Sequence, residues 1–278
     1  MKKYKMKIYS LWLQGYENAP DLIKTCIDQW AKLNPTYTFE LLEQSDVEHL
    51  LKEFPLKIKD ITSQSLSDIT RIALLNKNGG IWVDATVFPT KPLSDWLDAT
   101  VNNTEFFTYQ REGQAEYPKD RPISAWFLYT KKPSVIIEKL WNETLRYWSV
   151  EHYKMIDFEN SNYYADPIGF MGLSQEIPNA PYPYHWFQHI FAYLIKTDIQ
   201  FAKAWSSCTY KPITKPHQMQ YWVREELLNK NATNVLTEEK IKSIIEDSEM
   251  QKLNWRMRFP LETMGKYSTL PKTGKNGC

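Results

Sequence analysis

The hydrophobic positions of the first fifty residues alternate between two periods. Residues 7–13 and 36–42 are short runs rich in strand-forming side chains. Residues 22–33 carry apolar side chains three and four positions apart, which is the spacing of one buried helix face. A second helix is expected after residue 44, because Ser45-Asp-Val-Glu48 has the form of a capping box. The chain is therefore expected to begin with strand, helix, strand and helix.

The same alternation continues to residue 84. The apolar spacing predicts a helix over residues 65–76, ended by the glycine pair Gly79-Gly80, and then a short buried strand over residues 81–83. Strands that alternate with helices indicate an α/β fold with a mainly parallel sheet covered by helices. Ligands of such sheets bind beyond the carboxyl ends of the strands, which is where Asp84 is expected to lie.

The second half of the chain gives weaker patterns. Strands are expected over residues 106–109 and 125–129, and helices over 133–148, 186–195 and 237–253, the last of them facing mainly solvent. Prolines make residues 150–183 loop-rich, and long loops often carry function. No linker is apparent, so residues 1–278 are expected to form a single domain.

Composition narrows the function classes. The 42% hydrophobic and 24% charged residues are typical of a folded domain. A net charge of +1 lacks the positive field that nucleic-acid binding requires, so nucleic acid is not an expected partner. Aromatic residues make up 14% of the chain, and flat rings with a polar edge stack on sugars and nucleobases, although most of them are expected in the core.

The cysteines and the N-terminal segment indicate the compartment. Three widely spaced cysteines indicate neither a zinc site nor a disulfide framework and fit a reducing compartment. The apolar stretch after the first residues is too short for a signal peptide or a membrane span, so a cytoplasmic protein is expected. Four lysines within residues 1–7 leave open a peripheral contact with an anionic membrane surface, although such a segment is more often a solvated tail.

Two neighbouring segments carry the candidate chemistry, SDITR at residues 67–71 and GGIWVDAT at residues 79–86. Asp68 and Arg71 are three positions apart and share one helix face, so they either pair with each other or point together at a ligand. Taken alone, they would be a surface ion pair worth at most about 1 kcal/mol, and Asp84 would be a turn aspartate.

Together the two segments resemble the DXD-type sugar transferases of bacterial capsular polysaccharide synthesis, whose hallmark is S-D-x-x-R followed by G-G-I-W-x-D-A-T. The segments LWLQG (11–15), AP (19–20) and WAKLNP (30–35) are also similar to that family. The resemblance covers roughly residues 7–93. It implies a GT-A fold, an αβα sandwich related to the catalytic domains of glucosylating toxins, with a donor-binding half over residues 1–95 and an acceptor-side, largely helical part over 96–278.

The resemblance also implies which residues hold the nucleotide-sugar donor, for which UDP is the expected nucleotide. The matching donor-site residues are Trp12, Ser67, Asp68, Arg71, Gly80 and Asp84. In the family the first-strand tryptophan stacks on the nucleobase, which points to Trp12. The helix Asp and Arg hold the donor sugar, and the DXD aspartate addresses ribose, sugar and metal. Asp84, Asp68 and Arg71 are accordingly the expected catalytic residues.

A divalent cation, Mn²⁺ or Mg²⁺, is the implied cofactor, with Asp84 and Thr86 as its expected ligands. Such an ion can neutralise the charge that develops on the departing diphosphate. Thr86 stands where the DXD pattern has a second aspartate, and a hydroxyl is a weaker ligand than a carboxylate. A further ligand is sought in the C-terminal half, where the candidates are Asp166, His185, His189 and His217. Each histidine there is more often a structural residue.

The acceptor side of the reaction stays open. If the reaction inverts configuration, a carboxylate base is needed, for which Asp157, Glu159 and Asp166 are candidates; if it retains configuration, the leaving phosphate can take the proton. The expected function is a glycosyltransferase that acts on a saccharide or lipid-linked oligosaccharide in capsule or exopolysaccharide biosynthesis. The alternatives are a transferase that glycosylates a protein side chain, and a non-catalytic protein that binds nucleotide-sugars or glycans.

Overall fold

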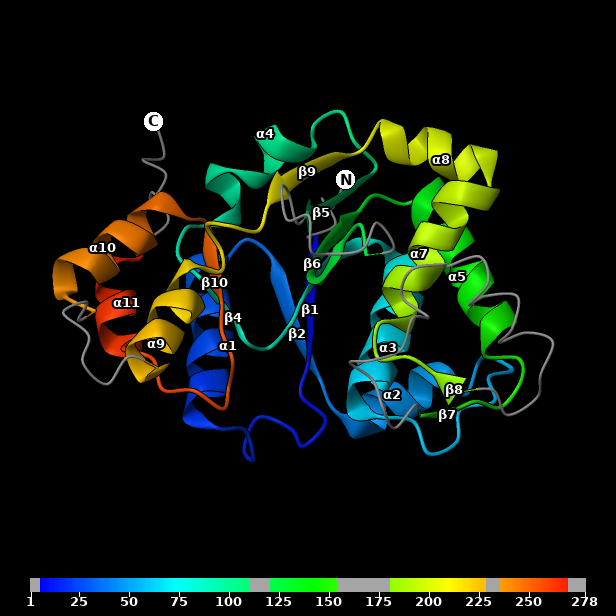
Figure 1. Cartoon of the computed structure of the whole chain (residues 1–278), viewed down its shortest axis with the longest axis horizontal. Helices are drawn as coiled ribbons and strands as arrows, with labels where there is room; N and C mark the ends of the chain where they lie inside the picture. Colours follow the sequence, from blue (N-terminus) through cyan, green and yellow to red (C-terminus); the bar gives the residue numbers. More distant parts are fainter. Residues whose placement is uncertain (1–5, 111–120, 155–180, 229–235, 270–278) are drawn as a thin grey trace, which may run out of the picture. The chain divides into compact units, whose positions relative to one another are not determined.

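The computed structural model describes residues 6–110, 121–154, 181–228 and 236–269. These residues fall into two units, each described by itself. The first unit comprises Met1–Leu41, Val83–Asn102 and Ile213–Cys278, and the second comprises Leu42–Trp82 and Asn103–Pro212. Figure 1 shows the elements of both units, with colours that follow the sequence from the N-terminus (blue) to the C-terminus (red).

The first unit opens with β1 (Lys7–Leu11), α1 (Asp21–Leu33) and β2 (Thr38–Leu42), as the sequence predicts. The helix begins after Pro20, whose fixed φ suits a helix start, and it buries the face that carries the apolar spacing. It ends at Asn34, whose side-chain amide donates to the carbonyl of Trp30 and accepts from the backbone N–H of Leu93. That asparagine therefore ties the end of α1 to a distant part of the same unit.

A two-stranded ribbon brings the C-terminal part of the first unit beside the segment that follows residue 84. Strand β4 (Val87–Pro89) pairs antiparallel with β10 (Met250–Lys252), and Lys252 lies opposite Val87 in the register. The indole Nε1 of Trp30 donates to the carbonyl of Val87 at 2.8 Å, which ties the ribbon to α1. Lys252, from the C-terminal part of the chain, is thus placed next to the predicted site segment.

The expectation of one helix over residues 237–253 was wrong. Helix α10 (Glu238–Asp247) stops before Ser248, which has extended backbone, and the chain then enters β10. The carbonyl of Ser248 accepts from the hydroxyl of Thr90, so a tertiary contact with the segment after β4 replaces the local helical preference. Six of the ten residues of this helix are exposed, as expected, and the face that carries Ile241, Ile244 and Ile245 is buried.

The rest of the first unit is helical. It contains a short 3₁₀ turn (Leu93–Asp95), α4 (Leu97–Val101), α9 (Gln218–Leu228) and α11 (Leu261–Tyr267). Helices α9, α10 and α11 lie beside α1 and the β4–β10 ribbon (Figure 1), and their apolar faces close one core. Buried members of that core include Ile23, Cys26, Ile27, Ala85, Phe88, Met219, Ile244 and Met264.

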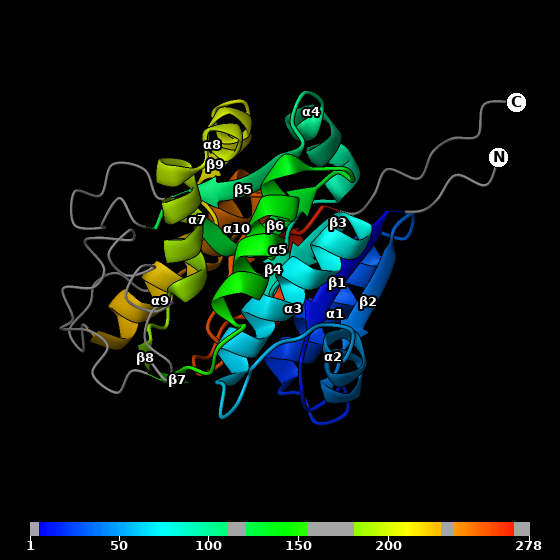
Figure 2. The ribbon, with the colours of Figure 1, turned by 90° about the vertical axis from the view of Figure 1, so that its right-hand side faces the viewer.

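The second unit is built from strands and helices that lie close together in sequence. Its elements are α2 (Gln44–Leu51), α3 (Ser63–Asn78), β3 (Gly80–Val83), β5 (Phe106–Gln110), β6 (Ser124–Thr130), α5 (Val135–Tyr147), β7 (Tyr153–Lys154), β8 (Pro181–Tyr182), α7 (Trp186–Thr197), α8 (Ile199–Ser206) and β9 (Thr209–Pro212). Its strands follow the order β3-β6-β5-β9, with β5 antiparallel to β6 and parallel to β9. Helix α3 packs on α5, and α5 packs on α7 and α8 (Figure 2).

The ends of α3 are fixed by a cap and a glycine. The hydroxyl of Thr62 accepts from the backbone N–H of Ser65, so the helix begins two residues before the predicted start. It ends, as predicted, at Gly79, which has φ +66°, and a Cβ there would lie 3.2 Å from the carbonyl of Thr130. This ending turns the chain directly into β3, the strand that leads to Asp84.

The capping box predicted at Ser45 lies two residues earlier. The backbone N–H of Glu43 donates to the Asp46 carboxylate at 2.9 Å, so Glu43 caps α2. Asp46 takes the role that the capping box gives to a glutamate, because its carboxylate reaches back to the backbone N–H of the cap residue three positions earlier.

The structure confirms an α/β protein with a mainly parallel central sheet. None of the helices in the described ranges is long and apolar enough to cross a membrane. The expectation of a single domain with a donor half over residues 1–95 and an acceptor half over 96–278 stays a prediction.

Candidate functional site

Asp84 and Thr86 lie in a tight turn directly after β3. The carbonyl of Asp84 accepts from the backbone N–H of Val87 at 2.9 Å, which closes the turn, and an aspartate is favoured at its first position. Ala85, between the two polar residues, is buried in the core of the first unit. Because that alanine anchors the turn, the polar residues on either side of it are held at fixed positions. The interpretation of Asp84 as a turn aspartate is therefore correct for its backbone.

A lysine side chain joins the two polar residues of this turn. The Nζ of Lys252 lies 2.8 Å from the Asp84 carboxylate and 2.6 Å from the Thr86 hydroxyl (the contacts are within the first unit). The side chains of Lys252 and Asp84 are 19% and 26% exposed, so this ion pair is largely withdrawn from water. The predicted metal ligands are thus brought together, and the positive charge between them comes from the protein.

Lys252 is held in place by the backbone on both sides. Its N–H donates to the carbonyl of Pro216 at 2.7 Å, and the N–H of Leu253 donates to the carbonyl of Thr86 at 2.9 Å. The sequence does not indicate this lysine, because it lies 166 residues from Thr86 within a segment predicted to be helical. No local pattern around it distinguishes it from the other lysines of the chain.

The predicted base-stacking residue, Trp12, is half-buried after the end of β1. Its ring meets that of Trp255 edge to face, with centroids 6.1 Å apart and planes at 80°. Trp255 is 43% exposed, and the guanidinium of Arg256 lies 4.9 Å from its ring centre. Trp12 also packs against the core of the first unit, so Trp255, which sequence reasoning missed, offers the more accessible aromatic face.

The second unit holds the other predicted residues in a buried network around Arg71. The guanidinium donates to Asp68 Oδ1 at 2.8 Å, to Ser67 Oγ at 3.0 Å and to the carbonyl of Ala125 at 3.0 Å. It also lies over the ring of Trp82, 5.0 Å from the centroid. The side chains of Arg71 and Asp68 are only 6% and 13% exposed, so the interpretation as a surface ion pair was wrong.

This network defines what each of its members can do. The guanidinium of Arg71 contacts three protein groups, so it fixes the position of Asp68. A carboxylate is a group that can accept hydrogen bonds from the hydroxyl groups of a ligand. Gly80, at the start of β3, has φ +107°, a conformation that favours glycine over any other residue.

The remaining candidates from the sequence do not form a metal site in the described ranges. Asp157, Glu159 and Asp166 lie outside the described residues. His185 precedes α7 without a side-chain capping hydrogen bond, His189 is fully buried in that helix, and His217 precedes α9. Nowhere in the described part of the chain do three or more His, Cys, Asp or Glu side chains gather closely enough to hold a metal ion.

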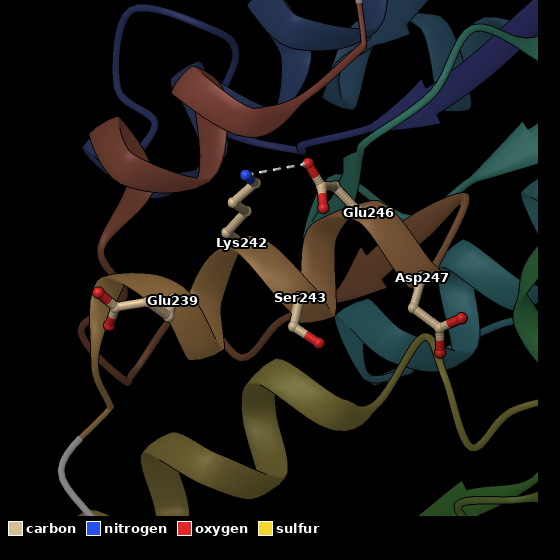
Figure 3. Close-up of a pocket in the computed structure, with 5 residues that line it drawn as sticks. All are labelled: Glu239, Lys242, Ser243, Glu246 and Asp247. Carbon is tan, nitrogen blue, oxygen red and sulfur yellow. Dashed lines mark ion pairs between the residues drawn. The ribbon is translucent and has the colours of Figure 1, made fainter.

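A shallow surface hollow lies along α10 in the first unit. Figure 3 shows its lining residues, which are Glu239, Lys242, Ser243, Glu246 and Asp247. Lys242 and Glu246 form an exposed ion pair at 3.9 Å. No predicted site residue lines this hollow. All of its lining side chains come from one face of a single helix, so we assign it no role.

Comparison with known families identifies the chain. The family model described as "Capsular polysaccharide synthesis protein" matches residues 1–165, which include both candidate segments. The chain belongs to this family. The capsular polysaccharide synthesis match confirms the resemblance that the SDITR and GGIWVDAT segments indicate.

The individual relatives of this chain are remote. The "O-glycosyltransferase braB" of Annulohypoxylon truncatum is 30% identical over 102 residues, which cover 32% of this chain. The chain thus spans about a quarter (24%) of that relative's length.

Among solved structures, a glycosyltransferase involved in glycosylation of the major capsid of PBCV-1 matches 95% of this chain and 98% of its own, with 10% identity and a TM-score of 0.43. The glycosyltransferase GlyE of Streptococcus pneumoniae matches 96% of this chain and 60% of its own, with 12% identity and a TM-score of 0.45.

Proposed function

We propose that this protein is a glycosyltransferase that moves a hexosyl group from a nucleotide-sugar, expected to be a UDP-sugar, to a saccharide acceptor in capsule or exopolysaccharide biosynthesis. The observation that carries this proposal is the charged turn after β3. There the segment GGIWVDAT, which resembles the family hallmark, places the Asp84 carboxylate and the Thr86 hydroxyl each within hydrogen-bonding distance of the ammonium of Lys252. Family membership and the transferases among its relatives support the same activity.

The chemistry of donor binding assigns roles to the two clusters. Asp84 and Asp68 are carboxylates that can accept hydrogen bonds from the hydroxyls of ribose and of the donor sugar. Arg71 serves as the positioning residue for Asp68, because its guanidinium contacts the protein. Trp12 and Trp255 supply the aromatic surface for the nucleobase, since every base offers a π face for stacking.

The residues around Asp84 do not fit the divalent cation that the family resemblance implies. Among the described residues, the two predicted ligands supply one carboxylate and one hydroxyl, and both are bonded to the ammonium of Lys252. Mg²⁺ and Mn²⁺ need oxygen ligands at about 2.0–2.2 Å. An ion bound to the same two oxygens would therefore be repelled by the neighbouring positive charge of Lys252. No step of the proposed reaction is therefore routed through a metal ion.

Binding of donors tests the proposal. Isothermal titration of the purified protein with a panel of UDP-, GDP-, CDP- and dTDP-sugars should find one class that binds, and the variant Asp84→Asn should bind it more weakly. An exposed acid of the same unit offers the matched control, Asp247→Asn, which should bind as the wild type does. A folded protein that binds none of the panel contradicts the proposal.

The acceptor is tested separately. Incubation with the binding donor and either a lipid-linked saccharide or a protein lysate should give a labelled saccharide-lipid and no labelled protein. Labelled protein alone would support the alternative transferase that modifies side chains. Binding of the donor without hydrolysis or transfer to any acceptor would support the non-catalytic binding protein. The cytoplasmic location and a peripheral contact with the membrane stay predictions.

A further inference from the structure

We propose that the ammonium of Lys252 is the resident cation of this site and takes the place of a divalent metal between Asp84 and Thr86. The part of this inference that concerns the donor rests on the proposed function. On that basis, Lys252 meets the negative charge of the donor's diphosphate, and sugar transfer proceeds without added metal.

The geometry around Nζ carries the first step. The ammonium lies 2.8 Å from the Asp84 carboxylate and 2.6 Å from the Thr86 hydroxyl, the same two side chains that the sequence predicts as metal ligands. An ammonium has three N–H donors, and these contacts use two of them. As far as the described residues go, the third donor and the exposed part of the side chain remain for an oxygen atom of a ligand.

The charge balance supports the same assignment. Two aspartates in a D-x-D pattern carry a charge of −2, which a divalent ion cancels. In this chain Thr86 removes one of those charges, and Asp84 with the ammonium of Lys252 again sums to zero. A divalent ion added to Asp84, Thr86 and Lys252 would leave a charge of +2 in a partly buried place, which is unfavourable because the charges are poorly hydrated there.

The fold fixes this lysine near the core. Backbone hydrogen bonds to Pro216 and Thr86 hold the strand end from which the side chain extends. Burial raises the pKa of the Cys26 thiol in α1, and the positive charge of Lys252 partly opposes that rise, which places the charge close to the buried face of the helix. A lysine held in this way differs from an exposed one such as Lys215, whose side chain is 53% exposed.

The role in the reaction follows from where charge develops. The bond between the anomeric carbon and the diphosphate oxygen breaks, and its electron pair stays on that oxygen. The acceptor oxygen forms the new bond to the anomeric carbon and loses its proton to a base or to the leaving phosphate. Lys252 keeps its own protons throughout and stabilises the departing diphosphate by a charge-assisted hydrogen bond.

Manganese alone provides the first test, because it does not depend on the donor. Electron paramagnetic resonance should show free Mn²⁺ in the presence of the wild-type protein, with at most the weak affinity of a poorly built oxygen site, a Kd of about 1 mM. Lys252→Met should create a tighter site, and Lys252→Met combined with Asp84→Asn should lose it. Lys215→Met, which removes the exposed partner of Asp247 in the same unit, is the matched control and should behave as the wild type does. A wild-type Mn²⁺ site that Asp84→Asn abolishes overturns the inference.

Binding of nucleoside diphosphates provides the second test. UDP, GDP, CDP and dTDP are titrated in EDTA and in Mn²⁺. The nucleoside diphosphate that binds should have the same affinity under both conditions. Lys252→Met should lower that affinity about 10- to 100-fold in EDTA. Lys252→Arg, which keeps the charge and the strand, should lose less than Lys252→Met. Binding that appears only with Mn²⁺ overturns the inference and leaves the proposed function standing. Failure of all four to bind under either condition contradicts the proposed function, and the Mn²⁺ titration then decides the inference alone.

Discussion

Replacing Arg71 with lysine tests the buried network of the second unit most sharply. The guanidinium is 6% exposed and donates to Asp68, Ser67 and the carbonyl of Ala125, while it covers the ring of Trp82. A lysine keeps the positive charge and can keep the ion pair with Asp68. It cannot reach three acceptors in fixed directions, because its ammonium is a single point at the end of a flexible chain.

The expected cost follows from the contacts that are lost. The hydrogen bonds to Ser67 and to Ala125 are each worth about 1 kcal/mol net. The planar contact with Trp82, a ring that is only 1% exposed, is worth about 1 kcal/mol more. We therefore expect Arg71→Lys to lower the free energy of unfolding by about 3 kcal/mol.

Urea unfolding, followed by far-ultraviolet circular dichroism, measures this change. Arg146→Lys is the matched control, because Arg146 also pairs with a carboxylate three residues away in a helix of the same unit, Glu143 of α5, but is 42% exposed. That control should change the free energy of unfolding by less than about 0.5 kcal/mol. If the two variants are equally stable, the network around Arg71 contributes nothing beyond a surface ion pair and the reasoning fails.

Three further predictions concern other parts of the chain. Trp12→Ala and Trp255→Ala should each weaken binding of the nucleoside diphosphate about 10-fold in calorimetry; unchanged binding in both would show that the pair only packs. Burial raises the pKa of the Cys26 thiol, and raises the pKa of the Cys208 thiol to about 11. Both should therefore escape iodoacetamide at pH 7.5 in the native protein and react in guanidinium, as followed by peptide mass spectrometry, and native labelling of Cys26 would contradict its burial. A lysine hydrogen bond lowers the pKa of Asp198, so its ionised form stabilises the fold above the unfolded pKa of about 4, and this contribution is lost as the pH falls through the folded pKa. The difference in unfolding free energy between wild type and Asp198→Ala should accordingly shrink from pH 6 to pH 3, and a constant difference would refute the ion-pair account.

The fold of the first hundred residues could be predicted from the sequence because local preference and tertiary packing agree there. The apolar spacing of α1 and α3 is the face that the structure buries, and the glycine at residue 79 ends α3 because the chain turns with positive φ. The C-terminal part could not be predicted in the same way. After Asp247 the pairing with β4 outweighs the helical pattern, and no local preference announces a partner more than 150 residues away.

The candidate site could be predicted only as far as its residues are local to the motif. The sequence indicated Asp84, Thr86 and the pair Asp68 and Arg71, and the structure brings each pair together within its own unit. It did not indicate Lys252 or Trp255, because a lysine and an exposed tryptophan are common and only the long-range ribbon gives them their place. The burial of Arg71 was also missed, since a spacing of three residues predicts a shared helix face but not what covers that face.

The most direct test of the central claim is the release of nucleoside diphosphate from the binding nucleotide-sugar, measured in EDTA for the wild type, Asp84→Asn and the control Asp247→Asn, with a lipid-linked saccharide as acceptor. We predict turnover by the wild type and the control, and a loss of about 100-fold or more in Asp84→Asn with its fold intact. Equal turnover by Asp84→Asn would contradict the assignment of the site to the turn after β3.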